Sequence, residues 1–571
     1  MTISLPYVKV LGTMSNSNKI PVSSGNNPGA SRRRFLSYLG ATPTLTALGG
    51  AGFLSTLEAP SALGATGPLD AGQRRHRAFA IRRDAAMLQR DRPDQVSTSN
   101  GDEQLYANRV GSFSKGLPHN QLGEVDLNAY NSMISALNSA QPGDFEAIPL
   151  GGTVKLADPQ AAYCYAMAGA DAAAIASPPA PAFSSAQTAG EMVEDYWSAL
   201  TRDVPYSQYS SDPMIAQACA DLSKLSDYRG PNVSGQITPD VIFRGLSPGE
   251  TTGPLVSQFL WKTIPFGAAQ FPQLYRTTVP GDDYMTTYSA WLNVQKGVAA
   301  GSNVFDSTPR YIRNNRDLSE YLHRDFMGQA NVLATLLLLS YGNPALNPNN
   351  PYLNYATEAG SITFGSQAAL DLMWSAPINA LHAVWWQKWL VHRRVRPEAF
   401  GGRIHNHLTG AAKYSIHSDV LNSAALQASF KAHGNYLLPI PYPEGSPIHP
   451  SYPAAHAVVG GAGVTMLKAM FNESFVIPSP VVPSDDGLTL LPYTGPPLTV
   501  SSELNKLAAN VSLGRNACGV HYRSDGVEGM RLGEEIAISI LRDMATVYNE
   551  QFAGFSFTRF DGNPITICPE C

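Results

Sequence analysis

Apolar residues recur every three or four positions along the second half of the chain, which is the period of an amphipathic helix. One such run extends from Leu318 to Ala334, and Gly342 ends it. Asp317 followed by Glu320 predicts that this helix begins with a capping box. Similar patterns predict further helices at 188–200, 365–395, 417–432, 454–470, 500–513 and 525–548.

Turn-forming residues interrupt much of the first half. Residues 66–310 combine short helical patterns with long segments rich in Gly, Pro, Ser and Asp, and 150–157 and 237–253 are predicted loops. Sustained apolar-polar alternation flanked by hairpin signals does not occur, so we do not expect a sheet-based core. We predict an all-α fold, a large single unit whose long irregular loops wrap the helices.

The N-terminal region has the features of an export signal. Residues 31–36 read SRRRFL, which fits the twin-arginine pattern. An apolar stretch at 41–54 and a small-residue cleavage region at 62–65 follow in the expected order. We therefore expect residues 1–65 to be a twin-arginine signal, and the protein to be periplasmic or secreted. The alternative is a flexible tail that contains arginines. No apolar run is long enough to span a membrane.

Composition narrows the classes of protein that fit. The chain has 571 residues, of which 44% are hydrophobic and 15% charged, with a formal net charge of -5. This apolar content can bury a core, so the protein is not disordered. The acidic balance argues against a nucleic-acid binder, and five cysteines are too few for a disulfide scaffold. The low charged fraction fits a large helical core in a protein that forms homo-oligomers.

Three segments of the second half combine fixed cations with histidines. The first reads KWLVHRRVRPE and contains four fixed cations and no acid from Lys388 to Arg396. On a helix these two residues lie about 80° apart, so both can face one pocket. Pro397 is expected to end that helix. The alternative is a solvated basic face at a helix C-terminus, although the neighbouring Trp385 argues against simple solvation.

The second segment, at 446–457, reads SPIHPSYPAAHA. Pro453 suits the first turn of a helix. The free backbone N–H groups of residues 454–456 would then form an anion site, with His456 beside it. The alternative is a buried histidine that only caps the helix.

The third segment places Arg515 six residues before His521, at another predicted helix junction. An ordinary loop histidine is the alternative here. Together with Lys388 and Arg396, the segments supply three permanent cations, two histidines and a helix N-terminus. A tetrahedral oxyanion needs this set of donors. Phosphate and vanadate are the natural occupants.

The order of these elements resembles the site pattern of vanadium-dependent haloperoxidases and their relatives, the PAP2-type acid phosphatases. The pattern is K-x7-R from Lys388, an element like P-S-G-H at 453–456, and R-x5-H from Arg515. Residues surrounding the site are similar to those of the algal and cyanobacterial bromoperoxidase branch, as are three segments outside it at 110–119, 243–249 and 560–562.

The resemblance implies an all-α fold built on two four-helix bundles, and assembly into dimers or larger rings. We expect residues 66–571 to form the haloperoxidase-like domain. Its N-terminal half would be about 66–345 and its active-site half about 346–571.

The resemblance also implies roles for the cofactor-binding residues. Vanadate would be bonded to His521, while three cations, Lys388, Arg396 and Arg515, would neutralise its oxygens. The amide of Ala455 would donate a further hydrogen bond to it.

Catalysis would use hydrogen peroxide and a halide. His456 would accept a proton from peroxide, and Lys388 would polarise the bound peroxide. Halide oxidation would then give hypohalous acid, which halogenates a small organic acceptor. His449 matches a histidine of bromoperoxidases and favours bromide and iodide over chloride. Trp385 matches an aromatic residue near the halide pocket, and a plain packing role is its alternative.

One departure from the family pattern affects the expected activity. The family's P-S-G-H is P-A-A-H here, so Ala454 offers no hydroxyl to the anion. We expect weaker vanadate binding or lower turnover. Two other functions stay open: a phosphatase that uses the same oxyanion site, with His521 attacking a phosphoester, and a non-catalytic binding protein.

Overall fold

A computed structural model describes residues 68–568, and the predicted export signal at 1–65 lies outside them. The α-helices are α1 (Ala71–Arg90), α2 (Asp102–Leu105), α3 (Leu127–Ser139), α4 (Pro142–Glu146), α5 (Ala186–Leu200), α6 (Pro213–Leu222), α7 (Tyr288–Gln295), α8 (Asn315–Arg324), α9 (Gln329–Ser340), α10 (Ser366–Trp386), α11 (Pro397–Leu408), α12 (Ser418–Leu421), α13 (Ala424–His433), α14 (Ala455–Met470), α15 (Val500–Ala517) and α16 (Arg523–Ala545).

Short 3-10 helices lie at Pro159–Tyr163, Tyr206–Gln208, Gln258–Leu260, Asn343–Ala345 and Pro351–Leu353, and a π-helical turn at Gln387–His392 extends α10. The strands are β1 (Ile264–Phe266), β2 (Ala269–Phe271), β3 (Val481–Pro483), β4 (Leu490–Pro492), β5 (Phe555–Thr558) and β6 (Pro564–Ile567).

The centre of the fold is a bundle of α10, α14, α15 and α16. Helix α14 is buried along its whole length except at His456. Glycines allow α14 and α16 to approach closely. A Cβ atom on Gly461 would lie 2.3 Å from the carbonyl oxygen of Met530, and one on Gly533 would lie 2.2 Å from that of Val458. Both contacts are with backbone atoms, so a side chain at either position would force the helices apart.

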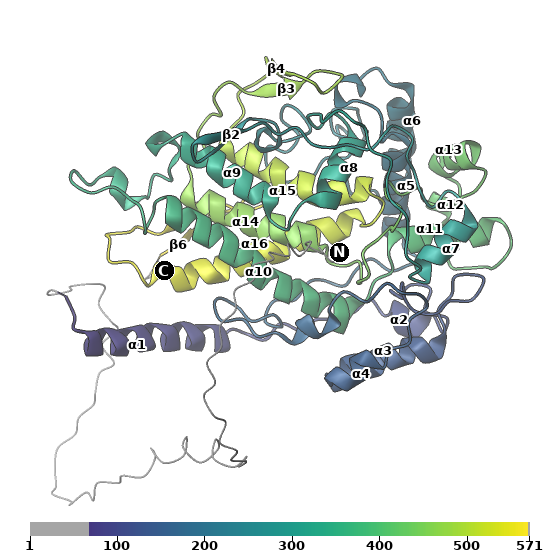
Figure 1. Ribbon diagram of the computed structural model, residues 1–571, viewed down its shortest axis with the longest axis horizontal. Helices are drawn as coiled ribbons and strands as arrows, with labels where there is room; N and C mark the ends of the chain where they lie inside the picture. The colour runs from purple at the N-terminus through teal and green to yellow at the C-terminus, as the bar shows by residue number, and fades with distance from the viewer. Residues whose placement is uncertain (1–67, 569–571) are drawn as a thin grey trace, which may run out of the picture. The chain divides into compact units, whose positions relative to one another are not determined.

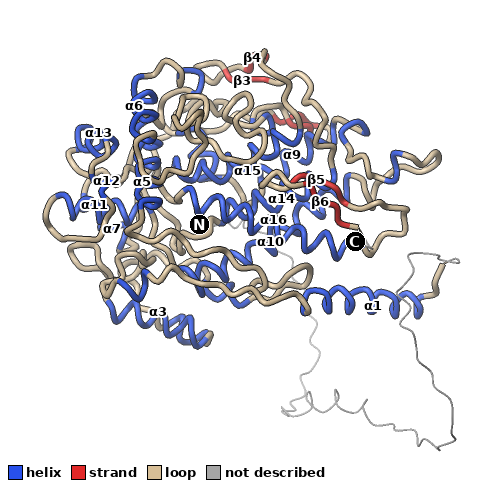
Figure 2. Tube along the Cα trace, turned by 180° about the vertical axis from the view of Figure 1, so that it is seen from behind, coloured by secondary structure: helices blue, strands red, loops and turns tan. Residues whose placement is uncertain are grey.

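Further helices surround this bundle. Helices α8 and α9 pack on α15, α14 and α10. Helix α5 runs crosswise to the bundle in Figure 1 and packs on α6, α12, α13 and α15, forming a second, smaller helical group. Both halves of the chain therefore contribute to the packing. Long loops run over the helices, as Figure 2 shows.

The prediction of a mainly helical fold is confirmed. The strands form three antiparallel two-stranded hairpins, β1-β2, β3-β4 and β5-β6, and none is a core sheet. Helices predicted at 188–200, 454–470, 500–513 and 525–548 are present, as is the one at 365–395, which ends at 392. No described helix combines the length and apolar character that crossing a bilayer requires.

The prediction of two of the helices as continuous is wrong, because each is divided into two helices in the structure. The run at 318–334 is divided between α8 and α9, because α8 ends where Asp325 becomes extended and Gly328, with a φ of 92°, starts a new helix. The cap of α8 is also different: the side chain of Asn314 accepts from the Asp317 amide. The helix at 417–432 is likewise divided between α12 and α13, since Ser423 caps the second one.

Candidate active site

The predicted site residues converge on one buried region where α10, α11, α14, α15 and α16 begin or end. Those brought together are Lys388, Arg396, His449, Ala455, His456, Arg515 and His521, with Trp385 beside His449. The three cations are at most 4% exposed. Charged groups taken out of water at this depth need partners.

Lys388 lies in the π-helical turn that follows α10. Its Nζ donates to the carbonyl oxygens of Pro450 and Ser451, at 2.7 Å each. Burial, reinforced by the positive charge of Arg396, holds the pKa of Lys388 well below its usual range. A nearby anion would oppose both effects and favour the charged ammonium.

Arg396 is not on the same helix as Lys388, so the prediction of one continuous helix is wrong. The helical turn ends at His392, Arg393 takes a left-handed φ of 39°, and Arg396 is the N-cap of α11. Pro397 therefore begins a helix, where its missing N–H costs nothing. The turn aims the Arg396 guanidinium at His521 Nε2, 2.8 Å away.

Arg515 lies in the last turn of α15 and approaches the site from another direction. Its Nη1 donates to the carbonyl oxygen of Leu322 at 2.8 Å, and its buried Nε has no hydrogen-bond partner. Among the described residues, no carboxylate forms an ion pair with Lys388, Arg396 or Arg515. These three buried cations lack the counter-charge that buried ions require.

His521 begins the turn before α16 in a defined tautomer. The Arg396 guanidinium can only donate, so His521 Nε2 must accept, and the ring proton is on Nδ1. That Nδ1–H donates to the carboxylate of Asp525 at 2.9 Å. Burial, with Arg396 and Lys388 adding to it, holds the pKa of His521 well below its usual range. The imidazole is neutral, and its Nε2 lone pair faces the cations.

The N-terminus of α14 supplies backbone donors. Ala454 is the N-cap and provides no side-chain hydrogen bond. Its own amide donates to the carbonyl oxygen of Asp525 at 2.8 Å, so the prediction that this N–H is free is wrong. Within the described residues the amides of Ala455 and His456 have no acceptor. A buried helix end with unpaired donors is a site for an anion.

His456 follows in the first turn of α14. Its Nε2 lies 3.2 Å from Asp325 Oδ1, and its side chain is 16% exposed. It lines a small hollow between α9 and α14 with Asp325, Met327 and Asn331. Burial lowers the pKa of His456, and Arg515 adds to this effect while Asp325 opposes it. A neutral, oriented imidazole of this kind can accept a proton.

His449 and Trp385 lie together on the side of the site next to Arg396. Their ring centroids are 4.9 Å apart, and Arg396 Nη2 lies 3.1 Å from His449 Nδ1. Burial, followed by the charge of Arg396, holds the pKa of His449 well below its usual range.

The geometry and the comparisons with known proteins point to the same family. The VCPO second helical-bundle domain matches residues 372–550. A vanadium-dependent bromoperoxidase of Ascophyllum nodosum is 34% identical over 530 residues, covering 88% of this chain and 93% of the relative. One of Corallina officinalis is 32% identical over 598 residues, covering 88% and 100%. The chain belongs to the vanadium-dependent bromoperoxidase family.

A solved structure agrees with this assignment. The homohexameric second vanadate-dependent bromoperoxidase of Ascophyllum nodosum aligns with a TM-score of 0.84 and 28% identity, covering 94% of this chain and 96% of that one. The family resemblance drawn from the sequence motifs is therefore confirmed, together with the helical fold class.

Two carboxylates that contact the histidines of this site were not predicted from the sequence. Asp325 lies in the break between α8 and α9, and nothing in the sequence links it to His456. Asp525 follows His521 by four residues at the start of a predicted helix, a spacing that could have suggested the contact. Both orient a histidine, in the way that carboxylates commonly orient metal-binding or proton-transferring imidazoles.

Proposed function

We propose that this protein is a vanadate-dependent bromoperoxidase that oxidises bromide and iodide with hydrogen peroxide to hypohalous acid. One observation carries the proposal: three buried cations without a carboxylate partner lie near a neutral histidine, and one of them, Arg396, is 2.8 Å from its Nε2 atom. Membership of the vanadium-dependent bromoperoxidase family selects vanadate among the oxyanions that this charge arrangement suits.

The residues fit vanadate as a group. Lys388, Arg396 and Arg515 would neutralise its oxygens, and the Ala455 amide would donate to one of them. His521 Nε2 would bond the metal after Arg396 Nη1, which now donates to that nitrogen, turns to a vanadate oxygen. When bound, vanadium(V) supplies a Lewis acid that activates peroxide for attack by a halide. The Nδ1–H bond to Asp525 keeps the His521 lone pair on the side of the cations.

His456 is the proposed proton acceptor. Its depressed pKa keeps the ring neutral at ordinary pH, and Asp325 fixes its orientation. A proton taken from hydrogen peroxide would make the ring positive beside Asp325, which favours that charge. Lys388 would place its positive charge against the bound peroxide.

The halide is proposed to approach between Trp385, His449 and Arg396. The Arg396 guanidinium would attract the anion, and an aromatic ring such as Trp385 can meet an anion with its positive edge, not with its electron-rich face. The hypohalous acid would then halogenate a small electron-rich organic compound.

The proposal extends to assembly and location. We propose a homo-oligomer, as in the homohexameric relative, exported by the twin-arginine route to the periplasm or outside the cell. Support for export comes from the order of the basic, apolar and small-residue segments in 1–65.

The decisive experiment measures bromination by the vanadate-free protein, with peroxide and bromide, before and after vanadate is added. A phosphoester hydrolysis assay runs in parallel on the same preparation. The expected result is bromination only after vanadate addition, with little hydrolysis. Vanadate-independent phosphatase activity without bromination would overturn the proposal.

A further inference from the structure

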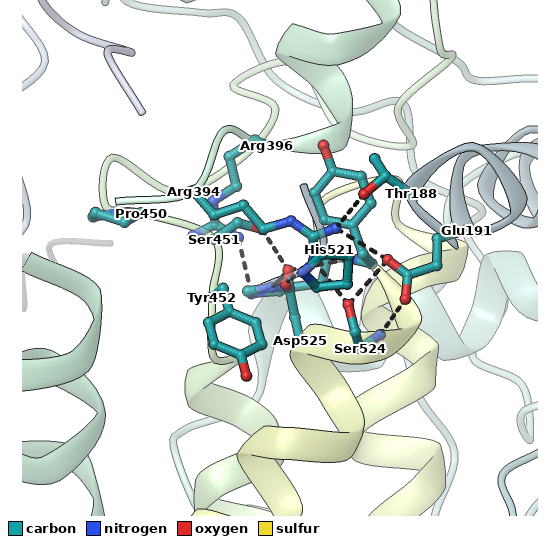
Figure 3. Close-up of polar contacts among 12 residues, drawn as sticks. Thr188, Glu191, Arg394, Arg396, Pro450, Ser451, Tyr452, His521, Ser524 and Asp525 are labelled. Carbon is teal, nitrogen blue, oxygen red and sulfur yellow. Dashed lines mark hydrogen bonds and ion pairs between the residues drawn. The ribbon is translucent and has the colours of Figure 1, made fainter. Parts of the chain in front are cut away.

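Arg394 differs from the other buried cations near the site because it is paired. Its Nη1 lies 2.8 Å from Asp525 Oδ1, and its Nη2 lies 3.1 Å from Glu191 Oε2. The side chain is 3% exposed, and its guanidinium stacks 3.8 Å above the ring of Tyr522. Figure 3 shows this network beside His521. With both carboxylates engaged, Arg394 has its counter-charge and is not a ligand for an oxyanion.

The pairing orients the carboxylate that holds His521. Arg394 binds Oδ1 of Asp525, which leaves Oδ2 for the His521 Nδ1–H at 2.9 Å and the Tyr522 amide at 3.2 Å. The hydroxyl of Ser451 also donates to Oδ2. Arg394 thereby determines which Asp525 oxygen faces His521 and how the plane of the carboxylate is oriented.

Arg394 and Asp525 also connect the other segments of the site. The Ala454 amide at the start of α14 donates to the Asp525 carbonyl, and the Ser451 amide donates to the Arg394 carbonyl. Ser451 in turn accepts from Lys388 Nζ. A shift of Arg394 would therefore displace the N-terminus of α14, Lys388 and His521 together.

We propose that Arg394 is a positioning residue that fixes the orientation of the His521 ring through Asp525, with Glu191 holding Arg394 in place. The vanadate part of this proposal rests on the proposed function. The ring orientation is a property of the vanadate-free protein, so it can be tested even if vanadate is not the cofactor.

The first test is NMR of the His521 ring in the vanadate-free protein. The wild type is expected to show a protonated Nδ1, held by Asp525, and an unprotonated Nε2. In Arg394→Met the other oxygen of Asp525 loses its partner, so the carboxylate is free to turn. The Nδ1 proton should then exchange with solvent faster than in the wild type, while Arg393→Met should leave its exchange rate unchanged. If Arg394→Met leaves the exchange rate of the Nδ1 proton unchanged, the proposal is wrong.

The second test is vanadate affinity, measured by equilibrium dialysis. Arg394→Met is expected to weaken vanadate binding about 10–100-fold, the range seen when support for a metal ligand is lost. Arg393→Met is the matched control, because Arg393 is a neighbouring half-buried arginine that pairs with Glu103 and does not touch Asp525. Equal losses in the two variants would contradict a positioning role. If no variant or wild type binds vanadate while the NMR results hold, the proposed function fails and the positioning role stands.

Discussion

Replacing Ala454 by serine tests the proposed anion site at the position where the sequence departs from the family pattern. Ala454 is fully buried and is the N-cap of α14, yet it provides no side-chain cap. A serine hydroxyl there could accept from a first-turn amide, which is worth about 1 kcal/mol at an N-cap. With vanadate bound it could instead donate to a vanadate oxygen, and a hydrogen bond to a charged group is worth about 1.5–3 kcal/mol.

The expected result is a vanadate dissociation constant about 10–100-fold lower in Ala454→Ser, since each 1.4 kcal/mol is about tenfold in affinity. Equilibrium dialysis of the vanadate-free protein measures this constant, and the rate of bromination at subsaturating vanadate should rise with it. Denaturant unfolding without vanadate reports the capping contribution separately.

Ala457→Ser is the matched control, because Ala457 is also fully buried and lies on the same helix, one turn beyond the N-cap. It adds a hydroxyl without offering it to the anion. An unchanged dissociation constant in Ala454→Ser, or an equal gain in Ala457→Ser, would refute the reasoning that the missing hydroxyl limits vanadate binding.

Three other changes test different parts of the structure. Asp325→Asn removes the carboxylate that raises the pKa of His456, so the acid limb of the pH profile of kcat/KM for peroxide should move to lower pH; a move to higher pH would contradict the assignment. Burial raises the pKa of Glu250 to about 7, so the free energy of unfolding should fall as pH rises from about 4.5 through 7, by roughly 3 kcal/mol at 1.36 kcal/mol per pKa unit. Glu250→Gln should flatten the pH dependence of Tm, and an unchanged slope of Tm against pH would contradict this role of Glu250. Gly461→Ala places a Cβ 2.3 Å from a backbone oxygen of Met530, so denaturant unfolding should show a loss of about 1–3 kcal/mol, whereas a neutral result would mean that α14 and α16 can separate freely.

Local sequence patterns predicted much of the fold, because most long helices here carry their own period and caps. They failed where one residue changes the backbone direction. Asp325 becomes extended and ends α8, and Gly328 adopts a left-handed conformation before α9, so one apolar run is divided in two. Arg393 likewise adopts a left-handed conformation between Lys388 and Arg396, so those two residues reach the site through a turn and not along one helix face.

The site could be predicted only in part for a similar reason. Lys388, Arg396, Arg515 and the histidines lie in short motifs with fixed spacing, and the family resemblance rested on them. Their supporting partners come from far along the chain. Asp325 is 131 residues from His456, and Glu191 is 203 residues from Arg394. No local pattern encodes such contacts, and only the packed helices bring them together.

The central claim is that a set of buried cations without carboxylate partners holds vanadate against His521 Nε2. The most direct measurement is the number of vanadate ions bound per chain, together with bromination, in wild type and in His521→Ala. The account predicts one tightly bound vanadate and bromination that rises with occupancy in the wild type, and loss of both in a folded His521→Ala protein. Retention of vanadate and activity by that variant would contradict it.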